Sequence, residues 1–499
     1  MMRIRCLAVI AIGIGAATTL QAQSPLPPMA AEHCTPASGD AAAAIARAWQ
    51  AAGLDRASGR IVHATSTDLS QQNFQSDRPY PPFFSMMAQG ERWFDLSTRT
   101  ERAQSKMSGL GVGGAPMTTI LSSEQATFFV RDTLIRALPA LFANSAATRA
   151  MSVWAVLSDW RAASDVKVMS RCVYREYPRL VVERLGVYGP ERLYLDVKTG
   201  LPVKLDREEP HYLWGQVRSE FVYQTWIAAG ELIRPGAVFH LVDGDVETER
   251  LDGDFSLVSS DSAPPMRIPA SPAMKAELAM FLQALPVDTE RVGHGMMVLK
   301  NRGYRHGVTM VRDTVFLLDA TQGDARGRLD SAWIARLYPT HEAVVVVVTD
   351  LAWPHIAGVR YWVSRGATVV SHASSRAMLD RVIARRWTRT PDALEIARRA
   401  KPVRMRFVGV SNSLSLAGGA LRLYPIDGIA SEGALMAWSP SDRSLWASDY
   451  VQTVNEPAIY TTEVARAAKR VGIEPVKVAA EHLGPTDWST ITRLAAKLP

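Results

Sequence analysis

Cysteine is scarce in this chain, and none lies near the polar residues that could carry chemistry. Only three cysteines are present in 499 residues, Cys6, Cys34 and Cys172. A zinc site built from several cysteine thiolates is therefore excluded. Removal of the N-terminal segment described below would leave Cys34 and Cys172, which either form one disulfide in an oxidising compartment or stay as two unpaired thiols.

Two further kinds of pattern are missing beyond the N-terminus. No later stretch approaches the ~18 uninterrupted apolar residues that a membrane-spanning helix needs, so we expect a soluble mature chain with no integral membrane segment. The formal net charge of +7 is spread thinly, and its clusters, Arg385-Arg386 and Arg398-Arg399-Lys401, lack interleaved aromatics. Such clusters are typical of solvated helix faces, so we expect no nucleic-acid partner.

The N-terminus has the features of a secretory signal peptide over residues 1–22. Residues 1–5 carry two positive charges, residues 6–20 are apolar, and Ala22 offers a small residue at the cleavage point. This pattern predicts a periplasmic or secreted protein, with an uncleaved membrane anchor as the alternative. Residues 23–39, which are rich in Pro, Ala and Ser, are expected to be a tether.

Residues 40–258 are predicted to form an α+β domain with an antiparallel, curved sheet. A helix is expected from Asp40, which has the side chain of an N-cap, to Leu54. Short alternating segments then predict strands, interrupted by helices over Thr133–Ala150 and Val153–Ala163. The strand rhythm and the D-x-x-T-G-L-P turn at Asp196–Pro202 resemble the half-barrel of periplasmic lipoprotein-carrier-like proteins.

A linker is predicted over residues 259–285. Residues 259–272 (S-S-D-S-A-P-P-M-R-I-P-A-S-P) contain four prolines among small polar residues, and this composition prevents regular structure. At 499 residues the chain is also too long for one ordinary core. We therefore expect a second domain over residues 286–499, in which strands and helices alternate.

The stretch Val344–Gly358 (V-V-V-V-V-T-D-L-A-W-P-H-I-A-G) is the most informative part of that second domain. Its five consecutive valines predict a short strand buried on both faces, at the centre of a covered sheet. Asp350 and His355 follow, and both side chains can bind a metal or transfer a proton. Because chemistry in α/β proteins gathers at the carboxyl ends of such strands, we expect a functional site here.

This stretch resembles the metal-binding loop of the metallo-β-lactamase superfamily, in which a strand leads into T-H-x-H-x-D-H. The resemblance extends through the second domain and implies a four-layer αββα sandwich. It also implies two metal ions, held by this loop, by a later H-[ST]-x-G loop, by a bridging aspartate after a strand, and by a final histidine in a G-H-G-like turn. The activity it implies is attack by a metal-activated water on an ester, amide, thioester or phosphoester.

The first metal site of that family has lost its histidines in this chain. Asp350 and Ala352 stand at the two histidines of T-H-x-H, and Pro354 stands at the aspartate. Ala430 occupies the histidine position of the H-[ST]-x-G loop, within I-A-S-E-G. Alanine has no lone pair to offer a metal, so the resemblance implies at most the second metal site.

The second metal site keeps three residues at family positions. They are His355, Asp449 at the end of L-W-A-S-D, and His482 in A-E-H. With Asp350 as a fourth ligand they are predicted to hold one zinc ion, and Asp350, His355 and Asp449 are the predicted catalytic residues. In the alternative no metal is bound, His355 packs beside Trp353, and Asp449 bonds directly to His482.

Two functions remain open at this point. The first is an exported metal-dependent hydrolase with a variant single-metal site, which acts on a small-molecule substrate shaped in part by the N-terminal domain. The second is a non-catalytic pseudoenzyme or scaffold protein, whose N-terminal sheet binds an apolar ligand. Metal content separates the two, and a tightly filled sheet interior counts against the second.

Overall fold

The computed structural model describes most of the chain outside the N-terminal segment, the predicted linker and several loops. Within these described residues, no helix is long and apolar enough to cross a membrane. The predicted signal peptide, residues 23–32 of the tether and residues 268–285 of the linker lie outside them. The described residues are 33–71, 78, 80, 83, 86–109, 112–114, 116–122, 126–130, 133–136, 147–174, 177–186, 188–267, 287–301, 304–455 and 458–498.

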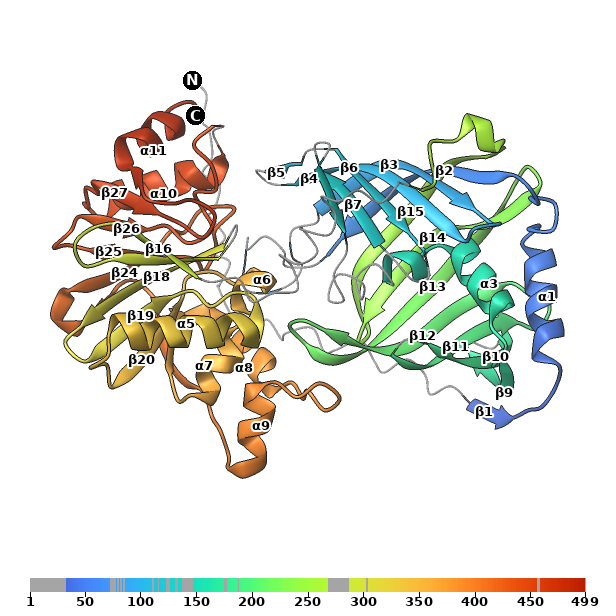
Figure 1. Ribbon diagram of the computed structural model, residues 1–499, viewed down its shortest axis with the longest axis horizontal. Coiled ribbons are helices and arrows are strands. Elements are labelled where there is room, and N and C mark those ends of the chain that lie inside the picture. Colours follow the sequence, from blue (N-terminus) through green and yellow to red (C-terminus); the bar gives the residue numbers. More distant parts are fainter. Residues whose placement is uncertain are drawn as a thin grey trace, which may run out of the picture.

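One antiparallel sheet of 15 strands makes up the N-terminal half (Figure 1). Its strands are β1 His33–Pro36, β2 Ile61–Ser70, β3 Met86–Asp95, β4 Thr100–Gly109, β5 Val112–Gly113, β6 Met117–Leu121, β7 Ala126–Val130, β8 Thr133–Arg136, β9 Lys167–Tyr174, β10 Tyr177–Gly186, β11 Gly189–Asp196, β12 Pro202–His211, β13 Gly215–Ala229, β14 Leu232–Val242 and β15 Asp245–Val258. The sheet runs in chain order from β9 to β15, and β15 then pairs with β2. Two stretches that are distant in the sequence thereby form one continuous sheet.

Two helices cover one face of this sheet, α1 (Ala41–Ala51) and α3 (Val153–Ala162). Asp40 caps α1 by accepting a hydrogen bond of 3.0 Å from the backbone N–H three residues on, as its side chain predicts. Both helices pack against the sheet in one apolar cluster, which includes Trp160 and Phe221. The chain's own side chains therefore fill this face.

Two sequence predictions for this half are wrong. The helix predicted over Thr133–Ala150 does not begin there, because Thr133–Arg136 is strand β8 and pairs with β7. Residues 137–146 lie outside the described residues, and residues 147–150 are helical. Pairing with a neighbouring strand thus overrides the local pattern. The tether predicted to extend to residue 39 is shorter, since His33–Pro36 is strand β1 of the sheet.

A disulfide between Cys34 and Cys172 joins β1 to β9, which is one of the two arrangements that the sequence leaves open. The two cysteines are separated by 138 residues.

Reduction of this disulfide is expected to lower the free energy of unfolding by about 2–4 kcal/mol, because the unfolded chain regains the conformational freedom of the loop between the two cysteines. Denaturant unfolding with and without reductant measures this change. The double variant Cys34→Ser, Cys172→Ser serves as the control, and equal unfolding midpoints for all samples would contradict the expectation.

The C-terminal half is built from two sheets and the helices that cover them (Figure 1). The first sheet contains β16 Asp288–Arg291, β17 Met297–Asn301, β18 Tyr304–Val311, β19 Thr314–Leu318, β20 Ala343–Val348, β21 Thr368–His372 and β22 Arg406–Val410. The second contains β23 Leu414–Leu416, β24 Leu421–Pro425, β25 Leu435–Ser439, β26 Ser444–Trp446, β27 Lys477–Ala479 and β28 Thr486–Asp487. The helices are α5 Gly323–Leu337, α6 Trp353–Ile356, α7 Val359–Ser364, α8 Arg376–Ala384, α9 Ala393–Ala400, α10 Ile459–Arg470 and α11 Trp488–Ala495.

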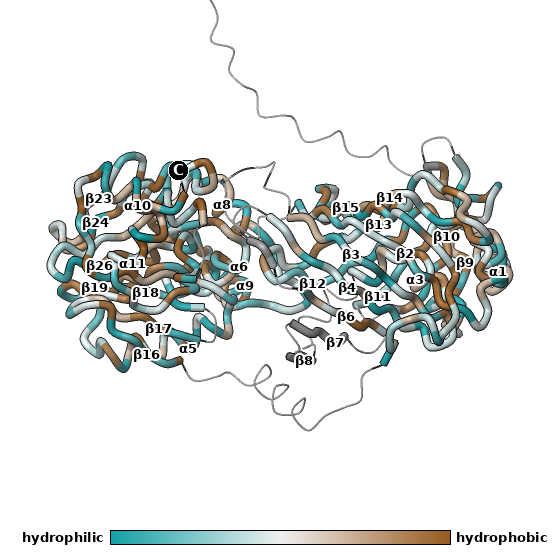
Figure 2. The backbone as a smooth tube through the Cα atoms, turned by 90° about the horizontal axis from the view of Figure 1, so that it is seen from above, coloured by the Kyte–Doolittle hydropathy of each residue, from teal (hydrophilic) through white to brown (hydrophobic). Residues whose placement is uncertain are grey.

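Three clusters of buried side chains show that the layers run helix, sheet, sheet, helix. Residues of α5, α7, α8 and α9 share one cluster with the first sheet, including Val346. Between the two sheets, Val347 of the first shares a cluster with Trp446 of the second. Residues of α10 and α11 pack with the second sheet around Val478. Hydrophobic stretches accordingly run through the interior (Figure 2), and the predicted αββα sandwich is confirmed.

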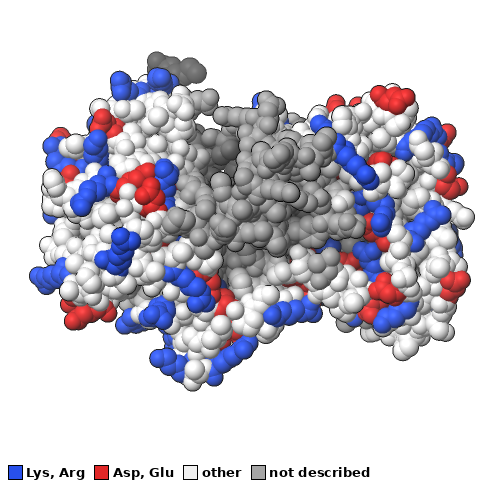
Figure 3. Space-filling model, viewed as in Figure 1, with Lys and Arg blue, Asp and Glu red and all other residues white. Residues whose placement is uncertain are grey.

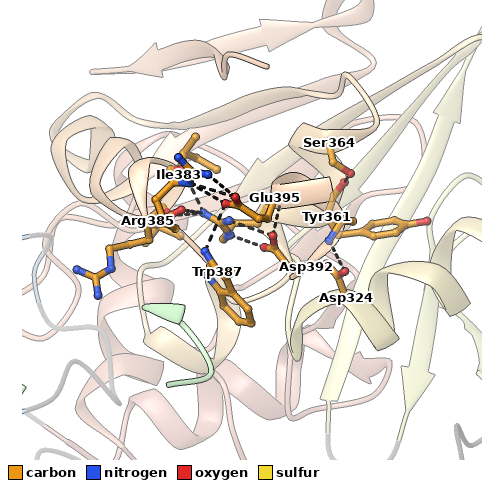
Figure 4. Close-up of polar contacts among 12 residues, drawn as sticks. Asp324, Tyr361, Ser364, Ile383, Arg385, Trp387, Asp392 and Glu395 are labelled. Carbon is orange, nitrogen blue, oxygen red and sulfur yellow. Dashed lines mark hydrogen bonds and ion pairs between the residues drawn. The ribbon is translucent and has the colours of Figure 1, made fainter. Parts of the chain in front are cut away.

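A buried arginine ties three of the covering helices together. Arg360, on α7, is 1% exposed, and its guanidinium pairs with Asp392. The same group donates to the carbonyls of Ile383 and Arg385 at the end of α8, at 3.1 and 2.9 Å. Asp392 in turn caps α9 by accepting the Glu395 N–H at 2.7 Å (Figure 4). Arg360 thus satisfies helix-end groups that are buried away from water.

Charged side chains are mixed over the visible face of both halves. Lys and Arg lie among Asp and Glu there, without a broad area of one sign (Figure 3). This distribution matches the thin spread of charge in the sequence. The expected lack of a nucleic-acid partner stays a prediction.

Candidate metal centre

The valine stretch forms β20, which lies between the parallel strands β19 and β21. Its last three residues, Val346–Val348, are buried, as expected for a central strand. After the strand, the Asp350 side chain accepts the backbone N–H of Ala352 at 2.8 Å, and the short helix α6 begins one residue later. Gly358 ends the loop against the Ala320 carbonyl, where a Cβ would lie 2.7 Å away, so only glycine fits.

Four side chains that can bind a metal converge beyond the carboxyl ends of β20, β26 and β27. They are His355, Asp449, Glu481 and His482, and one ligand atom from each lies within 4.8 Å of the others. His355 Nε2 is 2.8 Å from Glu481 Oε2. His482 Nε2 is 3.3 Å from Asp449 Oδ1. The structure thus brings together three of the four predicted ligands and adds Glu481.

Parallel pairing of β26 with β27 places two of these contributions side by side. The ladder continues past the strands, because the Ala447 N–H donates to the Ala479 carbonyl at 2.9 Å. The Glu481 N–H then donates to the Ser448 carbonyl, also at 2.9 Å. Parallel strands deliver their following residues to the same edge. Asp449 therefore meets the turn that carries Glu481 although they are far apart in the chain.

Asp350 and Glu481 contact different ring nitrogens of His355. Both of its oxygens are 3.1 Å from His355 Nδ1, whereas Nε2 faces Glu481. Because a carboxylate accepts hydrogen bonds, Nδ1 carries a hydrogen and Nε2 is the nitrogen directed at the cluster. Ser448, whose φ of 55° is in the left-handed region, donates its hydroxyl to Asp350 at 2.8 Å. Asp350 thus orients His355 and is itself held in place.

Glu481 is the candidate ligand that the motif comparison misses, because the family has glycine at this position of its G-H-G-like turn. Its side chain is buried, and its Oε1 atom has no hydrogen-bond partner among the described residues. A buried carboxylate oxygen without a donor destabilises a protein unless a cation or proton is present. The available sequence signal was a pair of changes: the loop loses a carboxylate at Pro354, and a carboxylate appears beside His482.

Burial and neighbouring charges shift the pKa values in this cluster. Burial raises the pKa of Glu481 well above its ordinary value, and Asp350 adds to this effect against the attraction of His355. Burial opposes the positive charge of His355, but Glu481 and Asp350 together hold the pKa of His355 well above its ordinary value. A proton on His355 therefore neutralises part of the negative charge, and a metal cation would replace it.

A second group of buried carboxylates adjoins the cluster and consists of Asp319, Asp350 and Glu481. Burial raises the pKa of Asp319 to about 7, and the charge of Asp350 contributes. The oxygens of Asp319 already accept the Thr349 N–H at 2.6 Å and the Trp446 indole N–H at 2.7 Å. These hydrogen bonds connect Asp319, which follows β19, to β26 and to the loop after β20. We therefore do not count Asp319 among the candidate metal ligands.

One side of the cluster is open. The side chain of His482 is 30% exposed, whereas those of the other three members are at most 4% exposed. The ring of Tyr304 lies 5.0 Å from the His482 ring and 6.0 Å from the His355 ring, between centroids. Among the described residues, His482 and Tyr304 therefore border the exposed side of the cluster.

The donor set fits a metal ion. Two imidazole nitrogens and two carboxylate oxygens are ligands that zinc accepts in a four-coordinate site. The buried Oε1 atom of Glu481 and the two buried carboxylates of the cluster favour a divalent cation among these side chains. The residues present are therefore compatible with the predicted zinc ion, with Glu481 in place of Asp350.

Comparisons with known proteins give matches to solved structures alone. No family model matches the chain. No curated protein matches it either. Similar solved structures include TMB-1, with 17% identity, coverage of 42% of this chain and 96% of its own, and a TM-score of 0.33. They also include DIM-1 metallo-beta-lactamase (16% identity, 42% and 96% coverage) and a metallo-beta-lactamase from Pontibacter korlensis (13% identity, 42% and 97% coverage), both with a TM-score of 0.33.

At TM-scores of 0.33 these matches carry no argument about this chain. The layers, the strand order and the position of the valine strand in the C-terminal half were established above from its own sheets. They agree with the resemblance drawn from the Val344–Gly358 motif. The C-terminal half therefore has the αββα architecture that this resemblance implies, and residues 344–358 depart from the motif of the family.

Proposed function

We propose that the C-terminal half binds one zinc ion through His355, Asp449, Glu481 and His482 and hydrolyses a small-molecule substrate. The observation that carries this proposal is the convergence of four ligand atoms within 4.8 Å at the carboxyl ends of three strands. The side chains belong to three separate segments of the chain. The Asp350 carboxylate accepts a hydrogen bond from His355 Nδ1, and metal-binding histidines typically have such a partner.

The substitution pattern of the loop supports the same proposal. The second metal of the family takes two carboxylates and two histidines. Here Pro354 removes one of those carboxylates from the loop, and Glu481 supplies one from the turn after β27. The number and type of donor groups are thereby kept, although one of them comes from a different strand.

The residues of the chain divide the work of such a site. A bound zinc ion would supply Lewis acidity, which lowers the pKa of a water molecule and polarises a substrate carbonyl. Asp350 fixes the tautomer and the ring orientation of His355 through Nδ1. The buried Asp449 and Glu481 exclude solvent from the inner side of the centre. His482 and Tyr304 border the open side, where the substrate would be placed.

Metal content tests this proposal. Protein purified without chelator is expected to contain about one zinc per chain, and the double variant His355→Ala, His482→Ala is expected to contain almost none. The matched control is His341→Ala, His372→Ala, which removes two histidines outside the cluster. Metal analysis of the three proteins, with circular dichroism to verify folding, provides the measurement. The proposal would be contradicted if the wild-type protein contained much less than one zinc per chain and the variant His355→Ala, His482→Ala contained the same amount.

The same proteins test the hydrolytic part. A panel of simple esters and lactones is expected to reveal turnover that a chelator removes, that zinc restores, and that Asp449→Ala abolishes. Turnover that persists without zinc would be independent of this centre. Stoichiometric zinc without any turnover would favour the other function considered above, a non-catalytic scaffold protein.

The other part of that second function, an apolar ligand in the N-terminal sheet, has less support. The face of the sheet under α1 and α3 is filled by buried side chains such as Trp160 and Phe221. Further along the inner strands, Glu209 accepts the hydroxyl of Ser219, which also lies 3.2 Å from His240 Nε2. A packed and partly charged surface does not suit a long apolar ligand.

We also propose that the chain is exported to the periplasm or secreted after cleavage of residues 1–22. The Cys34–Cys172 disulfide supports this location, because disulfides persist in oxidising compartments. The N-terminal residue of the mature protein, determined after cell fractionation, provides the check. A cytoplasmic protein that begins at Met1 would contradict the proposal.

A further inference from the structure

Trp353 connects the metal-binding loop to the N-terminal half of the protein. It begins α6, two residues before His355, and is 7% exposed. Three rings of the N-terminal half meet its indole edge to face: Trp214 at 5.4 Å, His211 at 5.7 Å and Phe83 at 6.1 Å, between centroids. The Trp353 Nε1 atom has no hydrogen-bond partner among the described residues. Ring packing therefore sets the orientation of this indole.

The metal-binding loop needs such support from outside. α6 has only four residues, too few to be stable without tertiary contacts. In the family motif, several ligands of this loop fasten it to the metal ions. Here Ala352 and Pro354 occupy two ligand positions and offer no donor atom, so His355 is the one loop residue in the four-residue cluster.

We propose that the β12–β13 loop of the N-terminal half, residues 211–214, positions the metal-binding loop by holding Trp353. The N-terminal half is then a working part of the metal centre, and Trp214 and His211 act as positioning residues. This inference rests on the proposed metal-binding function. Figure 1 shows α6 on the side of the C-terminal half that faces the N-terminal sheet.

The β12–β13 loop is built to hold a fixed position. His211 Nδ1 accepts the backbone N–H groups of Leu213 and Trp214, both at 3.1 Å, which closes the turn. From the C-terminal half, Arg385 Nε donates to the Trp214 carbonyl at 2.7 Å. Arg385 also pairs at 2.6 Å with Asp243, in the turn between β14 and β15. The loop is thus fastened to both halves, next to the ring contacts with Trp353.

Zinc affinity and amide hydrogen exchange of the full-length protein test the inference. Trp214→Ala and Trp353→Ala are each expected to weaken zinc binding by about 10–100-fold, the usual effect of losing a group that orients a ligand. The double variant is expected to be no weaker than either single variant, because Trp214 acts through Trp353. Trp353→Phe, which keeps an aromatic ring, is expected to restore most of the affinity.

Amide exchange provides a readout that does not depend on metal. In zinc-free protein, Trp214→Ala is expected to speed exchange of the amides from Asp350 to Gly358. Trp154→Ala is the matched control, because this buried tryptophan of α3 belongs to a different apolar cluster from Trp214 and Trp353. It is expected to leave both the zinc affinity and the exchange of these amides unchanged.

The outcomes separate this inference from the function on which it rests. Wild-type protein that binds no zinc would end the proposed function, while faster exchange of the loop amides in Trp214→Ala would still support the positioning role. The inference would be overturned if Trp214→Ala kept both the zinc affinity and the amide exchange of the wild type. It would also be overturned if the losses of zinc affinity in Trp214→Ala and Trp353→Ala multiplied in the double variant. If Trp214→Ala does not fold, the milder His211→Ala takes its place in each comparison.

Discussion

Replacement of Glu481 by glutamine is expected to weaken zinc binding by at least about 100-fold, more than the loss of an orienting group behind a ligand does. The amide is neutral and a poorer donor to a cation, and it leaves Asp449 as the one carboxylate in the cluster. Glutamine has nearly the same shape, so the surrounding packing is kept. Competition of the protein with a fluorescent zinc chelator measures the affinity.

The matched control for this prediction is Asp330→Asn. Asp330 is a buried carboxylate in the same half that also pairs with a histidine, at 2.6 Å from His306 Nδ1. Among the described residues, Asp330 and His306 belong to no group of three or more side chains that could hold a metal ion. Asp330→Asn is therefore expected to lower stability and to leave zinc affinity unchanged. Equal zinc affinity for wild type and Glu481→Gln would show that Glu481 is not a ligand.

Arg360→Met is expected to lower the free energy of unfolding by about 3–5 kcal/mol, because it breaks a buried ion pair by removing one partner. Asp392 would keep its buried negative charge without the guanidinium, and the carbonyls of Ile383 and Arg385 would lose a donor. Methionine retains much of the apolar length of the arginine side chain, so the effect comes mainly from the charge. Urea unfolding followed by circular dichroism measures it.

A nearby exposed pair provides the control. Arg376 pairs with Asp380 on α8, and the two side chains are 52% and 49% exposed. Arg376→Met is therefore expected to change the free energy of unfolding by at most about 1 kcal/mol. If Arg360→Met and Arg376→Met destabilised the protein equally, the buried network of Figure 4 would not have the stabilising role assigned to it.

The sequence predicts the C-terminal half better than the N-terminal half, for a physical reason. The run Val344–Val348 has few alternatives, because consecutive β-branched residues at this length favour a strand covered on both faces. The strands of the N-terminal half are amphipathic, and their pairing is decided by partners far along the chain. β15 pairs with β2, and Thr133–Arg136 joins β7, although no local pattern announces either.

The candidate metal centre shows the same division at the level of single residues. The motif alone predicted His355, Asp449 and His482 as candidate ligands, which the structure brings together, because these positions depend on spacing along strands and turns. The roles proposed for Asp350 and Glu481 depend on the orientation of the His355 ring, because Nδ1 contacts Asp350 and Nε2 contacts Glu481.

Local sequence could not supply that last information. The orientation of the His355 ring follows from the packing of β20 against neighbours, from the parallel pairing of β26 with β27, and from the contacts of Trp353 with a loop more than a hundred residues earlier in the chain. Each of these is a long-range contact, formed only when the sheets assemble. The chain thus encodes its candidate ligands in short motifs, while their geometry, and with it the exchange of Asp350 for Glu481, arises from tertiary packing.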